Sequence, residues 1–557
     1  MFTSLIINLL SNYFKMNNEQ QNSPQKQNSY LPIIYSLILV AGLWIGYALS
    51  NRLHQGGANT AQVSSSSNEK INSLLDYIEY QYVDTINKKV LVEKTVTSLL
   101  QSLDPHSSYI PASEFDVANE QLEGNFDGIG VEFNIINDTI RVVTTIQGGP
   151  SEKIGVRAGD KIIKVEGKSV AGVKITNKEV FDKLRGKSGS KVTVSVLRMG
   201  FKKALEFKIT RAAIPLYSVD TYYMTAPSIG YIKISKFAAT TYDEYIKAFN
   251  SLTKQGMKKL ILDLRGNPGG YLNAAVDISD EFLANGLQIV YTQGKAQPKK
   301  TYKATTRGSF ENEGLAILID EGSASASEIV AGAIQDNDRG IIIGRRSFGK
   351  GLVQDQLQLP DGSAIRLTIA RYYTPTGRCI QKPYSDDKSE YYNEEYDRYA
   401  HGELLNADSI KLDKTKKYIT PEGKIVYGGG GIMPDEFVPL DTAKNNSFVN
   451  RAFYAGAVNT FAFEYADKHR ATILGYKTPK NYIDNYEVDN AALEAFYVYC
   501  ERQKITLGKI NKQKTNETLK PYLKAFIGRD VFDKEAYYPI INKQDKSILK
   551  AVEVLSK

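Results

Sequence analysis

The sequence predicts a multidomain protein that combines an α/β domain with a β-rich domain and has helical segments towards both ends. Three observations carry this prediction. An uncharged apolar run covers residues 30–49, strand-like alternation between glycine turns covers residues 126–213, and strands alternate with amphipathic helices over residues 228–344. With 557 residues the chain is also too long for one ordinary hydrophobic core.

Composition places the chain among folded proteins and excludes several functional classes. Hydrophobic residues make up 42% of the chain and charged residues 24%, which excludes a disordered protein. The net charge of +8 is small for this length, so no nucleic-acid partner is predicted. The two cysteines, Cys379 and Cys500, fit neither a disulfide framework nor a zinc site. We therefore expect no metal and no cofactor.

The apolar run near the N-terminus predicts a transmembrane helix. It has about the length of a bilayer span and carries Tyr30, Tyr35, Trp44 and Tyr47 as aromatic anchors. Basic residues are slightly more frequent before the run than after it, which favours a cytoplasmic N-terminus. We expect one pass through the cytoplasmic membrane, with the bulk of the chain on the extracytoplasmic (periplasmic) side.

The N-terminal part then divides into four segments. Residues 1–29 are a short cytoplasmic N-terminus and residues 30–50 a signal anchor, with a cleaved signal peptide as the alternative. Residues 51–68 are rich in Gly, Ser, Asn and Gln and predict a flexible linker. Residues 69–120 predict helices with a polar break near Asp84, because apolar residues recur there at helical spacing.

Residues 121–213 predict a peptide-binding β domain. A glycine turn can point successive backbone amides into one concavity that holds a carboxylate, beside a strand edge that a peptide can extend. This turn is Gly128-Ile129-Gly130-Val131. The alternative is a small β-barrel without a ligand. Because the run Gly-Asp-Lys-Ile-Ile-Lys-Val-Glu-Gly follows at residues 159–167, the segment resembles a bacterial PDZ domain.

Residues 214–440 predict an α/β core with a mostly parallel sheet. One glycine-rich turn, residues 265–270, follows a buried strand. A second turn, rich in serine, occupies residues 322–327 after the strand at 315–319. Ligands of such sheets bind at the carboxyl ends of the strands, so we expect both turns to face one pocket.

The serine-rich turn contains three candidate nucleophiles, Ser323, Ser325 and Ser327. A serine between a strand and a helix lies beside free helix amides, as nucleophilic hydrolases require, whereas the alternative is a simple helix cap. The four histidines lie far from this turn in the sequence. Lys350 can act as the base if desolvation lowers its pKa, and the carboxamide of Gln354 can orient the amine.

Three motifs in this core resemble those of the carboxyl-terminal processing proteases, the tail-specific Ser-Lys endopeptidases that contain a PDZ domain. They are Asp-Leu-Arg-Gly-Asn-Pro-Gly-Gly at residues 263–270, Gly-Ser-Ala-Ser-Ala-Ser-Glu-Ile at 322–329 and Phe-Gly-Lys-Gly-Leu-Val-Gln at 348–354. The resemblance extends over roughly residues 104–439. It implies that Ser325, which precedes Ala-Ser-Glu, is the nucleophile.

The resemblance also implies further functional residues. It implies a crotonase-like core whose oxyanion hole uses the amide of Ala326 and that of Gly269 or Gly270, without choosing between the glycines. It implies a PDZ domain that binds the free C-termini of protein or peptide substrates and gates an active site that forms an acyl-enzyme. Arg185 is a candidate for coupling the PDZ domain to the core.

The remaining segments carry no motif of that family. Residues 376–430 are polar and rich in tyrosine and predict loops. Residues 441–557 predict a helical C-terminal region, because apolar residues return to helical spacing there. A homo-oligomer is left open.

Two other functions fit parts of the sequence. A catalytically inactive PDZ scaffold would bind protein C-termini without cleaving them, although the proposed catalytic residues are all present. The pair Ser251 and Lys254 has the Ser-x-x-Lys pattern of penicillin-interacting enzymes, but it lies on an ordinary amphipathic helix and the partner motifs are absent from the sequence. We therefore predict a membrane-anchored serine endopeptidase.

Overall fold

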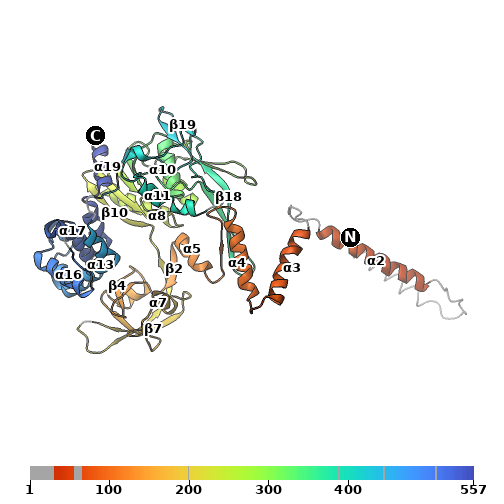
Figure 1. Cartoon of the computed structure of the whole chain (residues 1–557), viewed down its shortest axis with the longest axis horizontal. Helices are drawn as coiled ribbons and strands as arrows, with labels where there is room; N and C mark the ends of the chain where they lie inside the picture. The colour runs from red at the N-terminus through yellow and green to blue at the C-terminus, as the bar shows by residue number, and fades with distance from the viewer. Residues whose placement is uncertain (1–30, 55–64, 199, 386–387, 443–445, 509–510) are drawn as a thin grey trace, which may run out of the picture. The chain divides into compact units, whose positions relative to one another are not determined.

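The computed structural model divides the chain into two compact units, Met1–Val92 and Glu93–Lys557 (Figure 1). The predicted cytoplasmic N-terminus lies outside the described residues. The structure describes residues 31–54, 65–198, 200–385, 388–442, 446–508 and 511–557.

The first unit is helical. It contains α2 (Leu31–His54) and α3 (Ser65–Gln81), and α4 (Lys88–Gln101) begins at its end. Within the described part of the chain, no helix combines the length and the apolar character needed to cross a membrane. The transmembrane helix predicted for residues 30–50 is therefore not supported, and Tyr30 and the side chains at both ends of the run are not among those described.

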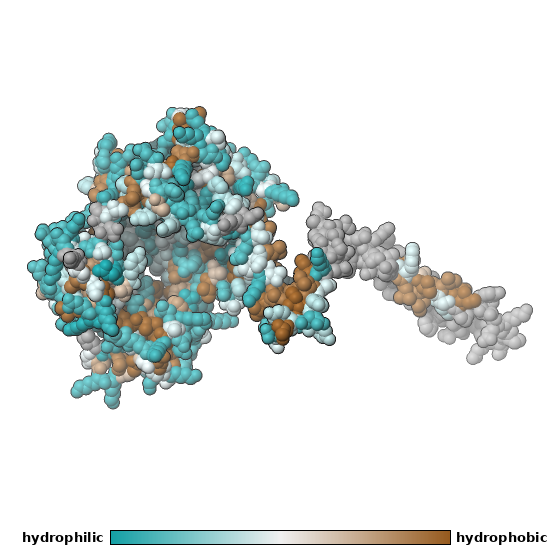
Figure 2. Space-filling view, viewed as in Figure 1, coloured by the Kyte–Doolittle hydropathy of each residue, from teal (hydrophilic) through white to brown (hydrophobic). Residues whose placement is uncertain are grey.

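The structure contradicts part of the predicted linker and contains the predicted helical break. Residues 51–54 and 65–68, at the two ends of the predicted linker, are helical, and the residues between them are not described. Asp84 lies between α3 and α4, as the sequence predicts. Along α3 the side chains of Ile71, Leu74, Tyr77 and Tyr80 remain exposed, and apolar side chains are visible in this region of the surface (Figure 2).

The PDZ domain is built around an antiparallel sheet in the order β3-β4-β5-β7-β8, with β6 paired to β5. Among the described strands, β3 pairs only with β4, so no described strand occupies its other edge. Helix α7 (Asn177–Leu184) begins at a capping box formed by Thr176 and Glu179. The other elements are β2 (Asn125–Gly128), β3 (Val131–Ile135), β4 (Ile140–Thr145), α6 (Pro150–Lys153), β5 (Lys161–Val165), β6 (Lys168–Ser169), β7 (Lys191–Leu197), β8 (Leu205–Thr210) and β9 (Ala212–Pro215), which pairs with β2.

The α/β core contains the predicted mostly parallel sheet, in the order β10-β11-β12-β15-β16-β21. Strand β10 is antiparallel to β11, and the other pairs are parallel. The strands are β10 (Val219–Ala226), β11 (Ile229–Ile234), β12 (Lys259–Asp263), β15 (Gly314–Ile319), β16 (Ile341–Gly344) and β21 (Glu436–Phe437).

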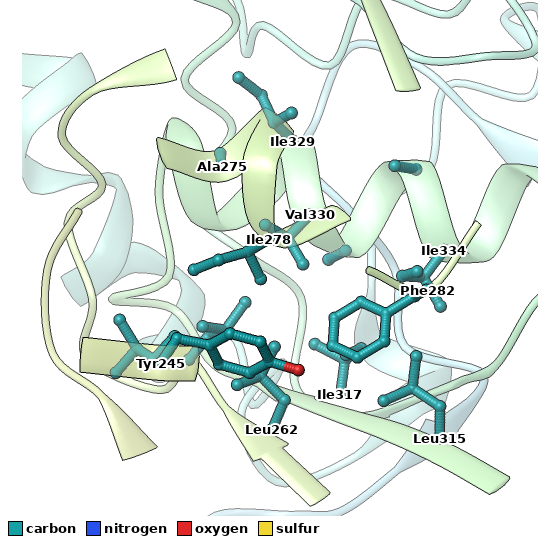
Figure 3. Packing of buried hydrophobic residues seen from close by; sticks show 14 of the residues in the cluster. Tyr245, Leu262, Ala275, Ile278, Phe282, Leu315, Ile317, Ile329, Val330 and Ile334 are labelled. Carbon is teal, nitrogen blue, oxygen red and sulfur yellow. The ribbon is translucent and has the colours of Figure 1, made fainter. Parts of the chain in front are cut away.

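Helices cover both faces of this sheet. On one face, α8 (Thr241–Lys254), α9 (Leu272–Asp280) and α10 (Ala326–Asp336) pack against Leu262 and Ile317. Tyr245, Ile278 and Phe282 fill the space between them (Figure 3). Burial of each such side chain stabilises the fold by roughly 1.5–3 kcal/mol.

The C-terminal helix α19 (Lys546–Ser556) covers the opposite face of the sheet. Its Ile548, Ala551 and Leu555 pack with Ile261 and Leu318, which alternate along the strands with the residues of the first face. Helix α19 is therefore part of the α/β core.

A second, antiparallel sheet lies next to the core and has the order β1-β18-β13-β14, with β17 paired to β18. Because β1 pairs with β18, it brings the segment around residue 106 to the β17–β18 hairpin, which follows the predicted lysine. Helix α5 (Phe115–Glu123) follows β1. The strands are β1 (Ser108–Ile110), β13 (Gln288–Gln293), β14 (Lys300–Lys303), β17 (Leu352–Gln358) and β18 (Ala364–Tyr373).

The prediction of loops over residues 376–430 is wrong in part. The segment contains α11 (Lys388–Ala400), a short helix η1 (Ala407–Ser409) and a hairpin of β19 (Lys417–Ile419) and β20 (Ile425–Tyr427). Some of its charged residues are buried in ion pairs, for example Arg398 with Glu403 at 2.7 Å. A polar sequence therefore does not mean an exposed one here, since each buried charge has a partner.

The C-terminal region is helical, as predicted. Phe448, Phe461, Tyr482 and Phe496 form the centre of its own hydrophobic core. Its helices are α12 (Ser447–Tyr454), α13 (Ala457–Lys468), α14 (Arg470–Leu474), α15 (Pro479–Asn485), α16 (Asn490–Arg502), α17 (Lys512–Phe532) and α18 (Lys534–Asn542).

Candidate active site

Ser325 lies at the turn between β15 and α10. Its backbone angles, φ 53° and ψ −112°, are rare for a residue with a side chain and cost on the order of 1–3 kcal/mol. The neighbouring hydroxyls are buried: Ser323 Oγ donates to Leu264 O at 2.8 Å and Ser327 Oγ donates to Asn267 O at 2.9 Å. Ser325 is half-buried, so the geometry favours it as the reactive serine among the three candidates.

The glycine turn after β12 lies directly against Ser325, because β12 and β15 are parallel neighbours. A Cβ added to Gly269 would lie 2.7 Å from Ser325 Cβ, and one added to Gly270 would lie 2.0 Å from Phe237 O. Both glycines have positive φ, 98° and 145°. Only glycine fits these two positions without rearrangement.

Two backbone amides beside Ser325 are free to bind an anion. The N–H of Gly269 donates to Asn267 Oδ1 at 2.9 Å. Over the described chain, no hydrogen bond occupies the N–H of Gly270 or that of Ala326, the first residue of α10. This geometry favours Gly270 over Gly269 as the second amide of the predicted oxyanion hole.

An ion-pair network fixes the start of the glycine turn. Arg265 bonds Asp263 through Nη2 at 2.7 Å and Asp545, the N-cap of α19, at 2.9 Å. Burial disfavours the Asp263 carboxylate, but Arg265 and Lys233 outweigh this and lower the pKa of Asp263. The C-terminal helix therefore supports the turn that faces the serine.

Glu328 connects the serine turn to the lysine turn, a role that its place in the sequence motif did not reveal. Its Oε2 accepts the N–H groups of Ser325 and Lys350, both at 2.8 Å. Its Oε1 accepts the N–H of Gly349 at 2.7 Å and the hydroxyl of Ser347. Burial raises the pKa of Glu328 to about 7, although these hydrogen bonds act in the opposite direction. The pattern Ser-x-x-Glu at a helix start was the signal available in the sequence.

Lys350 lies near Ser325, since the backbone N–H groups of both donate to the same oxygen of Glu328. Within the described residues, no hydrogen bond joins Ser325 Oγ to Lys350 Nζ. Burial lowers the pKa of Lys350, and the charge of Arg366 lowers it further, whereas Glu328 and Asp104 raise it. Tyr372 Oη contacts the backbone carbonyls of both Ser325 and Lys350 and is a second connection between the two turns.

Gln354 has a different partner from the one predicted. Its Nε2 donates to Thr368 Oγ1 at 3.4 Å, and Thr368 Oγ1 donates to Asp104 Oδ1 at 3.1 Å. No hydrogen bond from Gln354 to Lys350 is found among the described side chains. Gln354 thus lies in β17, four residues after Lys350, and its carboxamide bonds Thr368 in place of the amine.

One histidine, His106, lies close to the site, although all four histidines are far from the serine turn in the sequence. His106 Nε2 lies 2.7 Å from Tyr391 Oη, and Asp104 holds the backbone N–H of His106 at 2.7 Å. Burial and the charge of Lys350 lower the pKa of His106 to about 4. His106 is therefore neutral near pH 7 and lies close enough to Lys350 to sense its charge.

The predicted peptide-binding loop leads into the free edge of β3. Ile129 is buried and its carbonyl accepts the hydroxyl of Ser151 at 2.6 Å. Gly130, with φ 74°, would bring a Cβ within 3.0 Å of Ile214. Contacts with Ser151 and Ile214 thus fix the loop Gly128–Val131 beside the unpaired edge of β3.

Arg185 bridges the PDZ domain and α5. Its Nη1 lies 2.6 Å from Glu120 Oε2, and its guanidinium stacks 4.5 Å from the ring centroid of Phe126. On the same helix, Asn119 Oδ1 accepts from Arg366 at 3.0 Å. A continuous set of contacts therefore runs from Arg185 through α5 to a residue that lowers the pKa of Lys350.

Family models match three parts of the chain. Peptidase family S41 matches residues 228–387, and a PDZ domain matches residues 141–198. A family of unknown function, DUF8443, matches residues 448–533.

Curated relatives match over most of their own length. A carboxy-terminal-processing protease of Bartonella bacilliformis is 37% identical over 62% of this chain and 80% of its own. The carboxy-terminal processing protease CtpB of Bacillus subtilis is 36% identical over 58% of this chain and 68% of its own. Among solved structures, the photosystem II D1 C-terminal processing protease is 26% identical over 66% of this chain and 86% of its own, with a TM-score of 0.33. The resemblance seen in the sequence is confirmed: this chain belongs to the carboxy-terminal processing proteases of peptidase family S41 and is a serine-type peptidase with a PDZ domain.

Proposed function

We propose that this chain is an endopeptidase that binds the free C-terminus of a protein substrate in its PDZ domain and cleaves the substrate through Ser325 and Lys350. The observation that carries the proposal is the bridge from Glu328 to the N–H groups of both residues. It holds the two turns together, so only the side chains of Ser325 and Lys350 have to approach each other.

The chemistry follows from these positions. Neutral Lys350 takes the proton of Ser325 Oγ as the oxygen attacks the scissile carbonyl carbon. The N–H groups of Ala326 and Gly270 stabilise the oxyanion. The protonated amine then donates its proton to the leaving nitrogen, which leaves an ester on Ser325. A water molecule then gives a proton to Lys350 as it attacks the ester carbon. When the bond to Ser325 Oγ breaks, Lys350 returns this proton to Oγ, which restores the free hydroxyl and the neutral amine.

Recognition of the substrate C-terminus is tested by removing its charge. We expect an unfolded protein with an apolar C-terminal residue to be cleaved with a kcat/KM about 10–100-fold higher than the same protein with an amidated C-terminus. The reason is that charge-assisted hydrogen bonds of a carboxylate contribute about 1.5–3 kcal/mol. Cleavage rates are followed by gel and mass spectrometry.

The same experiment separates the proposal from its alternatives. Equal rates for the free and the amidated protein would contradict recognition of the C-terminus. Binding of the free protein without any cleavage would favour an inactive PDZ scaffold, the second function that fits the sequence.

We further propose that residues 30–49 anchor the protein in the cytoplasmic membrane, with its catalytic part on the extracytoplasmic side. The support is the uncharged, apolar sequence of this run. We expect the full chain to stay in the membrane fraction after an alkaline wash, and a chain that lacks residues 1–50 to be released. Release of both would contradict the anchor.

A further inference from the structure

The PDZ groove has a wall that does not belong to the PDZ domain. A cavity of about 700 Å³ lies along the free edge of β3 and helix α7. Phe126, Val131 and Phe181 line its PDZ side. Gly456, Asn459 and Thr460, at the start of α13, line it from the C-terminal helical region.

Contacts at the end of β3 hold this helix in place. Ile136, which follows β3, forms a buried cluster with Val143 of β4 and Phe463 of α13. Phe463 lies one helical turn after Asn459, so both side chains lie on the same side of α13. A Cβ at Gly159 would lie 2.9 Å from Asp467 Oδ1, which is a second close approach between the PDZ domain and α13.

The carboxamide oxygen of Asn459 has a hydrogen-bond partner, and its N–H₂ group can donate to a ligand. Its Oδ1 accepts a hydrogen bond from Arg529, whose guanidinium lies 4.8 Å from the ring centroid of Phe526. In the described part of the chain, Asn459 Nδ2 donates to no other group. The carboxamide is thus oriented, with a free N–H₂ donor on a residue that lines the groove.

The direction of a bound tail follows from the position of the glycine loop. The loop Gly128–Val131 precedes β3, so a peptide whose carboxylate binds there must run antiparallel along the strand. Successive residues advance by about 3.3 Å. The residue opposite Ile135 is then roughly the fifth from the C-terminus, next to the segment that contacts α13.

We propose that Asn459, which lines the groove beside Thr460, binds the part of a substrate tail that lies about five residues from its C-terminus. The occupant of this part of the groove is the extended tail of a protein substrate, with a backbone carbonyl accepting from Asn459 Nδ2. The proposal rests on recognition of the C-terminus by the PDZ domain, as proposed above. It gives the helical C-terminal region a role in substrate binding.

The test compares long and short tails. Fluorescent peptides of three and nine residues, with the same apolar C-terminal residues and a free carboxylate, are titrated into the full-length Ser325→Ala protein, and binding is followed by anisotropy. We expect Asn459→Ala to weaken binding of the nine-residue peptide about five- to tenfold and to leave the three-residue peptide unchanged.

Two further variants make the test specific. Asn459→Asp keeps the acceptor for Arg529 but replaces the N–H₂ donor, so we expect the same loss for the long peptide. Asn490→Ala, the same substitution at an exposed position of α16, should change neither peptide. If Asn459→Asp binds the long peptide like the parent protein, or if both peptides weaken equally, the inference is wrong. If neither peptide binds the parent protein, the proposed recognition of C-termini fails instead.

Discussion

Lys350→Ala and Ser325→Ala are each expected to lower kcat by about 10⁴-fold, and the double variant is expected to be no worse than either single one. A nucleophile and its base act as a unit, so the first substitution already abolishes the rate enhancement by the pair, and the second causes no further loss. The measurement is the steady-state rate on an unfolded protein substrate, with purity checked by mass spectrometry. Additive losses in the double variant would contradict a shared step.

The role of Lys350 also predicts the direction of the pH dependence. Burial lowers the pKa of Lys350, so the neutral amine becomes more abundant as the pH rises through that lowered pKa. We therefore expect kcat/KM to rise with pH and to fall on acidification. Lys350→Arg should be inactive at every pH, since a guanidinium keeps its proton. An active Lys350→Arg protein would exclude a lysine base.

A matched control separates chemistry from folding. Lys254→Ala makes the same change at an exposed position of α8 and should leave both kcat and thermal stability unchanged. It also tests the alternative pair Ser251 and Lys254, because that alternative requires loss of activity in this variant.

The sequence predicts the elements of the core because its local patterns agree with the tertiary structure. Buried strands such as Leu315–Ile319 have apolar runs bounded by glycine turns, and the parallel order follows from alternation with helices. The loops predicted around α11 show where this fails. Charged side chains that pair inside the fold, such as Arg398 and Glu403, have the same sequence signature as charged side chains in water.

Site residues that belong to a single turn could be predicted from the sequence. Contacts between turns that lie far apart in the sequence could not. The strand, turn and helix predict a reactive serine among Ser323, Ser325 and Ser327, and the family resemblance selects Ser325. Glu328 acts through groups on the lysine turn, and His106 reaches the site only because β1 pairs with β18. Gln354 is close enough in sequence to suggest a contact with Lys350, but Thr368 on the paired strand takes its hydrogen bond.

Glu328→Gln and Glu328→Ala are expected to show that this buried carboxyl group holds the active site together. Its four partners are all donors, and an ionised carboxylate accepts all four. A glutamine puts an N–H₂ group against two of these donors. We expect it to cost about 1–3 kcal/mol of stability and to lower kcat about 100-fold, because the two turns separate. Alanine leaves every donor unpaired and should cost more, about 3–5 kcal/mol.

The pH dependence distinguishes this role from simple packing. Burial disfavours the Glu328 carboxylate more than its four hydrogen bonds favour it, so the pKa of Glu328 in the folded protein, about 7, lies above the ordinary 4.5 of a glutamate. The folded protein therefore has its full stability below pH 4.5 and loses part of it as the pH rises to about 7 and the carboxyl group ionises. The difference amounts to about 3 kcal/mol. In denaturant melts, this fall should be seen in the wild type and in Glu535→Gln, the same change on an exposed turn of α18, and should be missing from Glu328→Gln. The same fall in Glu328→Gln would show that another group titrates. Full activity of the Glu328→Gln protein would show that the serine turn and the lysine turn stay together without the carboxylate. The contacts of Tyr372 with the carbonyls of Ser325 and Lys350 would then be sufficient to join them.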